Sequence, residues 1–407
     1  MELKLIAALG AVSCVFAQKG FWEGLADYPI EAFEVSTTVL QGKVFAACGL
    51  TAAGAVNRAF LYDPLIDTWA ETVPLPLLNG GDHCNLAAAD GKVYLLGALV
   101  RAQGPALADG STFEFDRAKG EWTRIAEMPT SRGASGVAVI GNKIYVAGGI
   151  SGNTNYAAME VFDIVTREWT RLPDMPTRRD HLLAQAVGGK VYAIGDHPGR
   201  DQNTSANEEY DPATMTWRFR GPIPTPGGGM TGGVFANRIV VAGGGEGFVG
   251  NVEYDPTTDQ WRDLEPLAAP RNGWYGTGAV LDGRLFLPAG GPTPGTSYSR
   301  RHSMFIYPLE LERPPRIGGM RNARDPAAPI APGETLLFWG EDLSSGERLG
   351  QEVLLNGVSA TYEGVPLTLS YVRQRFIVLS LPKDLPPPPA QVIVRTAGVA
   401  SRPFEIR

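Results

Sequence analysis

The sequence predicts an all-β protein in which a six-bladed β-propeller is followed by a small β-sandwich. The chain has 407 residues, and its 50 Gly and 32 Pro separate short apolar runs with frequent turns. Helical periodicity is scarce, and 44% of the residues are apolar, which is enough for packed cores. One unit of strands and turns also repeats along the chain, as a propeller requires.

The second strand of each unit shows the repeat most clearly. Each copy follows a tight turn at Gly or Asn, carries an apolar run and ends in small residues. Successive copies begin 46 to 51 residues apart. The six segments are GKVFAACG from Gly42, GKVYLLGA from Gly91, NKIYVAGG from Asn142, GKVYAIGD from Gly189, NRIVVAGG from Asn237 and GRLFLPAG from Gly283.

A third strand with aromatic and acidic residues follows each variable loop. Five units then place a Trp on a fourth strand, namely Trp69, Trp122, Trp169, Trp217 and Trp261. Four antiparallel strands make one twisted blade, and blades that pack face to face around an axis bury both faces and cover most strand edges. We expect the aromatic residue and the Trp to fill the space between neighbouring blades. The Asp that recurs on this strand is expected to serve its turn.

These features closely resemble the kelch repeat, with its paired Gly, its Tyr and its later Trp, over about residues 20 to 310. The Gly pair is intact at Gly148-Gly149, Gly243-Gly244 and Gly290-Gly291, and altered in the other three units. The resemblance implies a kelch propeller of the exported bacterial type, spanning residues 18–311.

The sixth unit has no Trp of its own. The segment Gly20–Leu25 matches the outer strands of later units, so residues 18–29 are expected to supply the missing strand, with Trp22 as the sixth Trp. This arrangement closes the ring by pairing its two ends. The alternative is a loose N-terminal tail.

The kelch pattern ends near Pro314-Pro315, which predicts a linker at residues 312–316. Residues 317–407 alternate short strands with Gly and Pro turns, as a β-sandwich does. The segments APGE, LNGV and the final AGVAS resemble IPT/TIG-type Ig-like modules of secreted bacterial proteins. The resemblance implies a spacer or contact module.

Residues 1–17 have the features of a signal peptide: Lys4, the apolar run Leu5–Val12 and the small residues around Ala17. Lipoprotein processing at Cys14 is the alternative. Either predicts a secreted, periplasmic or cell-surface protein. Cleavage before Gln18 leaves Cys48 and Cys84, which lie at strand ends on one face of adjacent blades and can form a disulfide.

The net charge of −7 comes without any Lys/Arg run, so nothing predicts binding to nucleic acid or to an anionic membrane. No segment after the leader is long and apolar enough to cross a membrane. Phosphate-binding loops, nucleophile elbows and His-Glu-x-x-His are absent, and Gly227-Gly228-Gly229 has the character of a turn. We expect no cofactor.

Two kinds of loop share one face of a propeller and surround its central channel. One joins each outer strand to the next inner strand, and the other joins the second strand to the third. Ligands usually bind at this face, called here the mouth, because loops vary while the sheets hold them rigid. The sequence places all four His on it, along with two Asp-His pairs in the same register. These residues are Asp82, His83, Asp180, His181, His197 and His302.

Arg and aromatic residues gather around the same loops. Arg provides a fixed fork of donors for carboxylates and sugar hydroxyls, and aromatic rings can stack on a flat ligand. The candidates are Arg132, Arg178, Arg179, Arg271, Trp274 and Tyr275. An Arg at the start of a kelch inner strand can instead bridge loops structurally, and the Asp-His pairs can make local turn hydrogen bonds.

A metal needs three or four converging ligands. We expect no metal site, because His83 and His181, two blades apart, are too distant for one ion. The alternative is a site at His181 and His197, which share a blade. Copper-radical oxidases of the galactose oxidase type share the kelch fold, but their Cys-linked Tyr and paired His find no match here.

Three functions follow as hypotheses. The first is an exported binding protein that takes a glycan or a peptide at the mouth. The second is an enzyme resembling kelch epimerases or mutarotases that act on acidic sugars, with Asp180 and His181 as acid/base candidates and Arg179 as the carboxylate clamp. The third is a structural module of the cell surface.

Overall fold

The computed structural model describes residues 19–308 except for 101–105, 200–201, 245–249, 272–277 and 292–297. In the C-terminal part it describes the backbone of residues 316–322, 335–341, 348–352, 358–362, 365–373, 376–380, 390–396, 399–400 and 404–406. The predicted signal peptide, Trp274 and Tyr275 lie outside the described residues, as does the predicted linker apart from Arg316.

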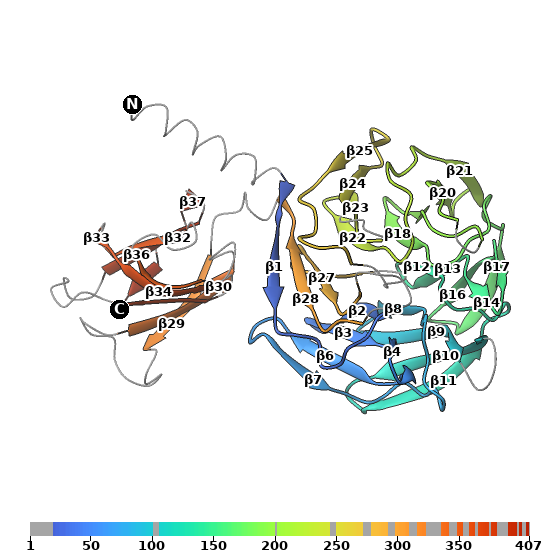
Figure 1. Cartoon of the computed structure of the whole chain (residues 1–407), viewed down its shortest axis with the longest axis horizontal. Coiled ribbons are helices and arrows are strands. Elements are labelled where there is room, and N and C mark those ends of the chain that lie inside the picture. The colour runs from blue at the N-terminus through green and yellow to red at the C-terminus, as the bar shows by residue number, and fades with distance from the viewer. Residues whose placement is uncertain are drawn as a thin grey trace. The chain divides into compact units, whose positions relative to one another are not determined.

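The propeller consists of six four-stranded antiparallel sheets (Figure 1), which confirms the predicted six-bladed, all-β architecture. Blade 1 is β2 (Ser36–Leu40), β3 (Lys43–Ala47), β6 (Ala59–Asp63) and β7 (Thr68–Glu71). Blade 2 is β8 (Leu86–Ala89), β9 (Lys92–Val100), β10 (Leu107–Asp116) and β11 (Glu121–Glu127). Blade 3 is β12 (Gly136–Ile140), β13 (Lys143–Ala147), β16 (Met159–Asp163) and β17 (Glu168–Leu172).

The remaining blades follow the same order from inner to outer strand. Blade 4 is β18 (Leu183–Val187), β19 (Lys190–Ile194), β20 (Asn207–Asp211) and β21 (Thr216–Phe219). Blade 5 is β22 (Thr231–Phe235), β23 (Arg238–Ala242), β24 (Asn251–Asp255) and β25 (Gln260–Asp263). Blade 6 is β26 (Ala279–Leu281), β27 (Arg284–Pro288), β28 (His302–Ile306) and β1 (Phe21–Leu25). Small hairpins extend two blades: β4 (Leu50–Thr51) with β5 (Gly54–Ala55), and β14 (Ile150–Ser151) with β15 (Thr154–Asn155).

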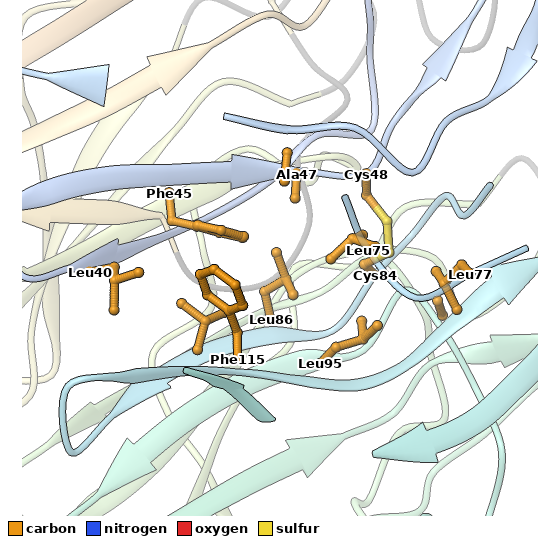
Figure 2. Close-up of a cluster of buried hydrophobic side chains, with 13 residues drawn as sticks. Leu40, Phe45, Ala47, Cys48, Leu75, Leu77, Cys84, Leu86, Leu95 and Phe115 are labelled. Carbon is orange, nitrogen blue, oxygen red and sulfur yellow. A yellow bond between two sulfur atoms is a disulfide. The ribbon is translucent and has the colours of Figure 1, made fainter. Parts of the chain in front are cut away.

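Aromatic pairs recur between the third and fourth strands. Trp69, Trp122, Trp169, Trp217 and Trp261 each lie 4.9–5.3 Å, centroid to centroid, from the Tyr or Phe opposite. These pairs help fill the clusters between neighbouring blades. Figure 2 shows the cluster between blades 1 and 2, in which Phe45 and Phe115 pack with Leu40, Leu86 and Leu95. The recurring Asp serves its turn, as expected: Asp63 and Asp163, for example, accept hydrogen bonds from backbone N–H groups two residues ahead.

The intact Gly pair has a steric reason at Gly148, where φ is 60°. A Cβ there would lie 2.4 Å from the carbonyl oxygen of Arg179 in the next blade. The strand end therefore approaches neighbouring backbone more closely than a side chain allows.

Cys48 and Cys84 form a disulfide between blades 1 and 2, with their Cα atoms 6.2 Å apart (Figure 2). The bond joins the end of β3 to the segment before β8, the position that the sequence indicated. It lies beside the hydrophobic cluster that the two blades share.

The disulfide is expected to stabilise the propeller by about 3 to 4 kcal/mol, because it closes a long loop in the unfolded chain. Unfolding in urea, with and without prior reduction, measures this effect. The Cys48→Ser/Cys84→Ser double variant should match the reduced protein and show no further response to reductant. A reductant response that persists in the double variant would contradict the assignment.

Blade 6 contains the segment from the start of the described chain. The strand order is β1-β28-β27-β26, and Trp22 lies 5.0 Å from Phe305, ring to ring. Further along, the Tyr28 N–H donates to the Arg300 carbonyl at 2.7 Å, and Arg300 Nε donates back to the Tyr28 carbonyl at 2.9 Å.

The C-terminal residues form two further antiparallel sheets. One has the order β29-β30-β35-β34-β31, and the other β33-β32-β36-β37 with β38 also paired to β36. Their bounds are β29 (Arg316–Asn322), β30 (Thr335–Glu341), β31 (Arg348–Glu352), β32 (Val358–Tyr362), β33 (Val365–Pro366), β34 (Thr368–Arg373), β35 (Phe376–Ser380), β36 (Ala390–Thr396), β37 (Val399–Ala400) and β38 (Phe404–Ile406). Among the described residues, no helix has the length and apolarity needed to span a membrane.

Candidate functional site

One position in the segment that precedes each inner strand lies at the mouth. It is the eighth residue before the turn Gly or Asn, and in blades 1 to 5 it is Glu34, His83, Ala134, His181 and Gly229. We call these residues the mouth ring. All five have a positive φ, between 53° and 68°. The Ala134 N–H donates to the His83 carbonyl at 2.9 Å, and the His181 N–H donates to the Ala134 carbonyl at 2.7 Å.

His83 and His181 meet across Ala134. Their Nε2 atoms are 2.9 Å apart and their ring centroids 4.8 Å apart. The expectation that they lie too far apart to share an ion is therefore wrong. The backbones of His83, Ala134 and His181 are joined by hydrogen bonds, so the two His side chains point the same way, as alternate residues of a strand do. The small side chain of Ala134 leaves room for the two rings to meet.

Carboxylates surround the pair on its other side. Nδ1 of His83 lies 2.6 Å from Asp82 Oδ1 and 3.0 Å from Glu34 Oε2. Nδ1 of His181 lies 2.8 Å from Asp180 Oδ2. Three carboxylates, those of Glu34, Asp82 and Asp180, therefore face the imidazole pair.

The pKa values follow from this arrangement. Burial would lower the pKa of His83, but Glu34 and Asp82 outweigh it and raise the pKa to about 10. Burial would likewise raise the pKa of Asp180, but His181 and the other His residues hold it below its ordinary value. The Asp180 carboxylate also accepts a hydrogen bond from Asn155 Nδ2 at 3.0 Å, which fixes its orientation.

His197 lies beside this cluster, with its ring 5.4 Å from that of His181. Its Nδ1 is 3.0 Å from the Gln202 carbonyl, and its Nε2 is 3.2 Å from Asp196 Oδ1. Burial and the nearby Asp180 raise the pKa of Asp196 well above its ordinary value. Burial and His181 lower the pKa of His197. At Gly228 a Cβ would lie 2.3 Å from His197 Nε2.

Arg132 and Arg179 are placed inside their blades. Both are fully buried, and each pairs with a buried carboxylate: Arg132 with Glu160 at 2.5 Å and Arg179 with Glu208 at 2.7 Å. Arg271 is also buried, and it donates to Ser303 Oγ and to the carbonyls of Leu287, Ala289 and Arg301. This burial favours the structural alternative for all three. Arg178, by contrast, is exposed at the rim.

His302 begins β28, beside a second-to-third loop of the mouth, but its side chain is buried and closed to a ligand. Its ring packs 4.5 Å from Tyr62 and 5.0 Å from Trp69 of blade 1. Its Nδ1 is 3.3 Å from the Ala26 carbonyl. Burial, together with Arg271, lowers its pKa to about 3.

His302 is expected to make the propeller less stable as the pH falls from about 6.5 towards about 3, by about 1.4 kcal/mol per pH unit. In that window the unfolded chain binds a proton at this side chain and the folded chain does not. The free energy of unfolding, measured in urea, should fall between about pH 7.5 and about pH 5 by about 2 kcal/mol more in the wild type than in His302→Phe. The raised pKa of His83 acts in the opposite direction and cancels in this comparison. Equal losses in the two proteins would contradict the prediction.

Three residues of the mouth cluster were not singled out from the sequence: Glu34, Asn155 and Asp196. The available signal for Glu34 was its register, since it precedes Gly42 by the same interval that separates His83 from Gly91. Asn155 and Asp196 carry no such signal, because they lie in loops that vary between blades.

Six four-stranded blades with the kelch pattern of Gly, aromatic and Trp residues define the class of this protein as a kelch-repeat β-propeller. The KLHDC2/KLHL20/DRC7 Kelch-repeats domain matches residues 82–291, just over half of the chain. The chain belongs to this family of Kelch-repeat proteins.

Individual relatives match over shorter stretches. Kelch-like protein 15 of Danio rerio is 30% identical over 152 residues, covering 33% of this chain and 25% of the relative. Kelch-like protein 24 of Rattus norvegicus is 36% identical over 200 residues, covering 48% of this chain and 32% of the relative. Kelch-like protein terF of Aspergillus terreus is 37% identical over 94 residues, covering 22% and 20%. The chain thus spans about a third or less of the length of these relatives.

Among solved structures, that of YjhT has a TM-score of 0.60 at 17% sequence identity. The match covers 69% of this chain and 97% of YjhT. At this level of identity it supports the propeller fold alone.

Proposed function

We propose that this Kelch-repeat protein is an interaction protein that binds a peptide segment of a protein partner at the mouth. The observation that carries this is a pair of exposed Leu side chains on loops of the mouth, the face that also holds the His and carboxylate cluster. Leu78 is fully exposed in the β7–β8 loop, and Leu107 is exposed where β10 begins. Both loops belong to the mouth, and the N–H of Gly81 near Leu78 donates to the Val56 carbonyl at 3.2 Å. Exposed Leu on the same face as carboxylates and His suits a mixed apolar and basic peptide.

A random peptide display library and a glycan array, both probed with the intact chain, test this proposal. We expect peptide binders whose affinity falls at least about 10-fold in the Leu78→Asp/Leu107→Asp variant. Val165→Asp is the matched control, because Val165 is exposed in a turn that joins the third and fourth strands, on the opposite face. Binding that is equally lost in the control, or binders found only on the glycan array, would contradict the peptide proposal. In the second case the mouth would take glycans.

The second candidate is an enzyme at the same mouth, similar to kelch epimerases that act on acidic sugars. It is favoured by the strongly shifted pKa values of His83 and Asp196 in one cluster. Asp180 and His181 remain the acid/base pair, but buried Arg179 is no longer available as the clamp, and exposed Arg178 would replace it. Anomer exchange of acidic sugars, followed by NMR, tests this candidate. Turnover unchanged in His181→Ala would remove the assignment.

We also propose that the protein is exported. The disulfide between Cys48 and Cys84 supports this, because such bonds persist in oxidising compartments. Chemical sequencing of the mature N-terminus tests it: a start at Gln18 is expected, and an intact Met1 would contradict cleavage. The C-terminal sheets support a β-sandwich of the IPT/TIG type that acts as a spacer or contact module.

A further inference from the structure

The mouth ring holds a convergence of side chains that the binding function does not require. Among the described residues, Glu34, His83 and His181 form a group whose potential ligand atoms all lie within 4.8 Å of one another. Imidazole nitrogens and a carboxylate are the donor set that Zn²⁺ accepts in sites with an open fourth position. We propose that Nε2 of His83 and Nε2 of His181 bind a divalent transition metal ion, with Zn²⁺ as the best match. Glu34 Oε2 lies 3.0 Å from Nδ1 of His83, so this carboxylate joins the ligand set by turning towards the Nε2 atoms.

The separation of the two rings is compatible with shared coordination. Two imidazole nitrogens bound to one tetrahedral Zn²⁺ lie about 3.3 Å apart. Nε2 of His83 and Nε2 of His181 are 2.9 Å apart, so a rotation that opens them by a few tenths of an ångström admits the ion.

The outer partners point to a metal more strongly than the pair itself does. A metal-binding His commonly donates its other ring N–H to a carboxylate, which fixes the ring and raises its basicity. Asp82 is hydrogen-bonded to Nδ1 of His83 at 2.6 Å, and Asp180 lies within ion-pair distance, 2.8 Å, of Nδ1 of His181. Asp180 is held in turn by Asn155. Each Nε2 is thereby left directed at the other ring and at the proposed ion.

The backbone places the three residues at equivalent positions of the mouth ring. The same positive φ occurs at Ala134 in blade 3 and at Gly229 in blade 5, so it is a property of the fold. Blades 1, 2 and 4 carry Glu34, His83 and His181 at this position. The hydrogen bonds through Ala134 hold the two His backbones at a set spacing.

Charge and access also fit a cation. Three buried carboxylates surround the pair, which is an environment that favours a bound cation. His83 and Glu34 are nearly buried, whereas the side chain of His181 is 17% exposed, which leaves an approach from the mouth. The open coordination position faces the same approach, where a water or a carboxylate of a partner can bind.

Isothermal titration of untagged, chelator-treated full chain with ZnCl₂ tests the proposal. We expect about one Zn²⁺ per chain, with affinity lowered more than about 100-fold in His83→Gln and in His181→Gln, and about 10- to 100-fold in Asp180→Asn. His197→Gln is the matched control, since His197 lies beside His181 outside the proposed ligand set, and it should retain wild-type affinity within about twofold.

X-ray absorption of the Zn²⁺-loaded wild type provides a second measurement that does not depend on any variant folding. Two imidazole ligands and oxygen ligands at about 2.0–2.1 Å are expected. The proposal is overturned by the absence of saturable binding, by binding that persists in His83→Gln/His181→Gln, or by binding that needs His197 and not His83. An absorption spectrum without imidazole scattering would also overturn it.

Discussion

Arg132→Met is expected to lower the free energy of unfolding by about 3 to 5 kcal/mol, because it leaves Glu160 as a buried carboxylate without its cation. Arg132 is fully buried, and its guanidinium holds together three parts of blade 3. It pairs with Glu160 at 2.5 Å and donates to the carbonyls of Gly148 at 2.6 Å and Val146 at 2.9 Å. Thr130 Oγ1 donates to the other Glu160 oxygen at 2.8 Å. Urea unfolding followed by tryptophan fluorescence measures the loss.

Arg171→Met provides the matched control. Arg171 also pairs with a carboxylate, Asp174 at 3.5 Å, but both side chains are at least half exposed, and such pairs contribute less than about 1 kcal/mol. The double variant Arg132→Met/Glu160→Leu should recover part of the lost stability, since no buried charge then remains. If Arg132→Met costs no more than Arg171→Met, the buried pair does not stabilise blade 3 and the structural role assigned to Arg132 falls.

Removing residues 18–29 is expected to lower the Tm by about 10 °C or more, because β28 would lose the strand that covers its edge. We propose that β1 closes the ring, a proposal supported by the strand order of blade 6 and by the packing of Trp22 on Phe305. Calorimetry of chains that begin at Gln18 and at Ile30 gives the comparison. A tail that is loosely attached would leave the Tm unchanged.

A synthetic peptide of residues 18–29 serves as the control for this truncation. Added in excess to the shortened chain, it should restore part of the lost Tm, since binding to the folded state alone raises its stability. A scrambled peptide of the same composition should have no effect. Equal rescue by both peptides would show that specific strand pairing is not the cause.

Much of the candidate site could be anticipated because propeller topology assigns loops to faces. The register of Asp82-His83 and Asp180-His181 before their turns was enough to place both pairs at the mouth. The contact between His83 and His181 was not predictable, since it depends on the angle between alternate blades and on the small Ala134 between them. His302 shows the reverse case. Its place at the end of a loop suggested a ligand-facing residue, but its ring packs against Tyr62 and Trp69 of blade 1.

The Arg residues show where residue type alone is ambiguous. Arg132 and Arg179 have the same fork of donors whether they hold a ligand or a carboxylate of their own blade. Glu160 and Glu208 lie 28 and 29 residues away in the chain, so their pairing depends on a register that only the folded sheet sets.

By itself, the sequence determined the repeat, the number of blades and the class of loop on which each candidate residue lies. A period of apolar strands, Gly turns and Trp residues suffices for this, because short-range sterics and burial dictate each blade separately. The tertiary structure alone decided which side chains meet. Blades pack around a common axis. His83 and His181 are 98 residues apart in the chain, and they come within hydrogen-bond distance only because of the twist and spacing of the sheets between them.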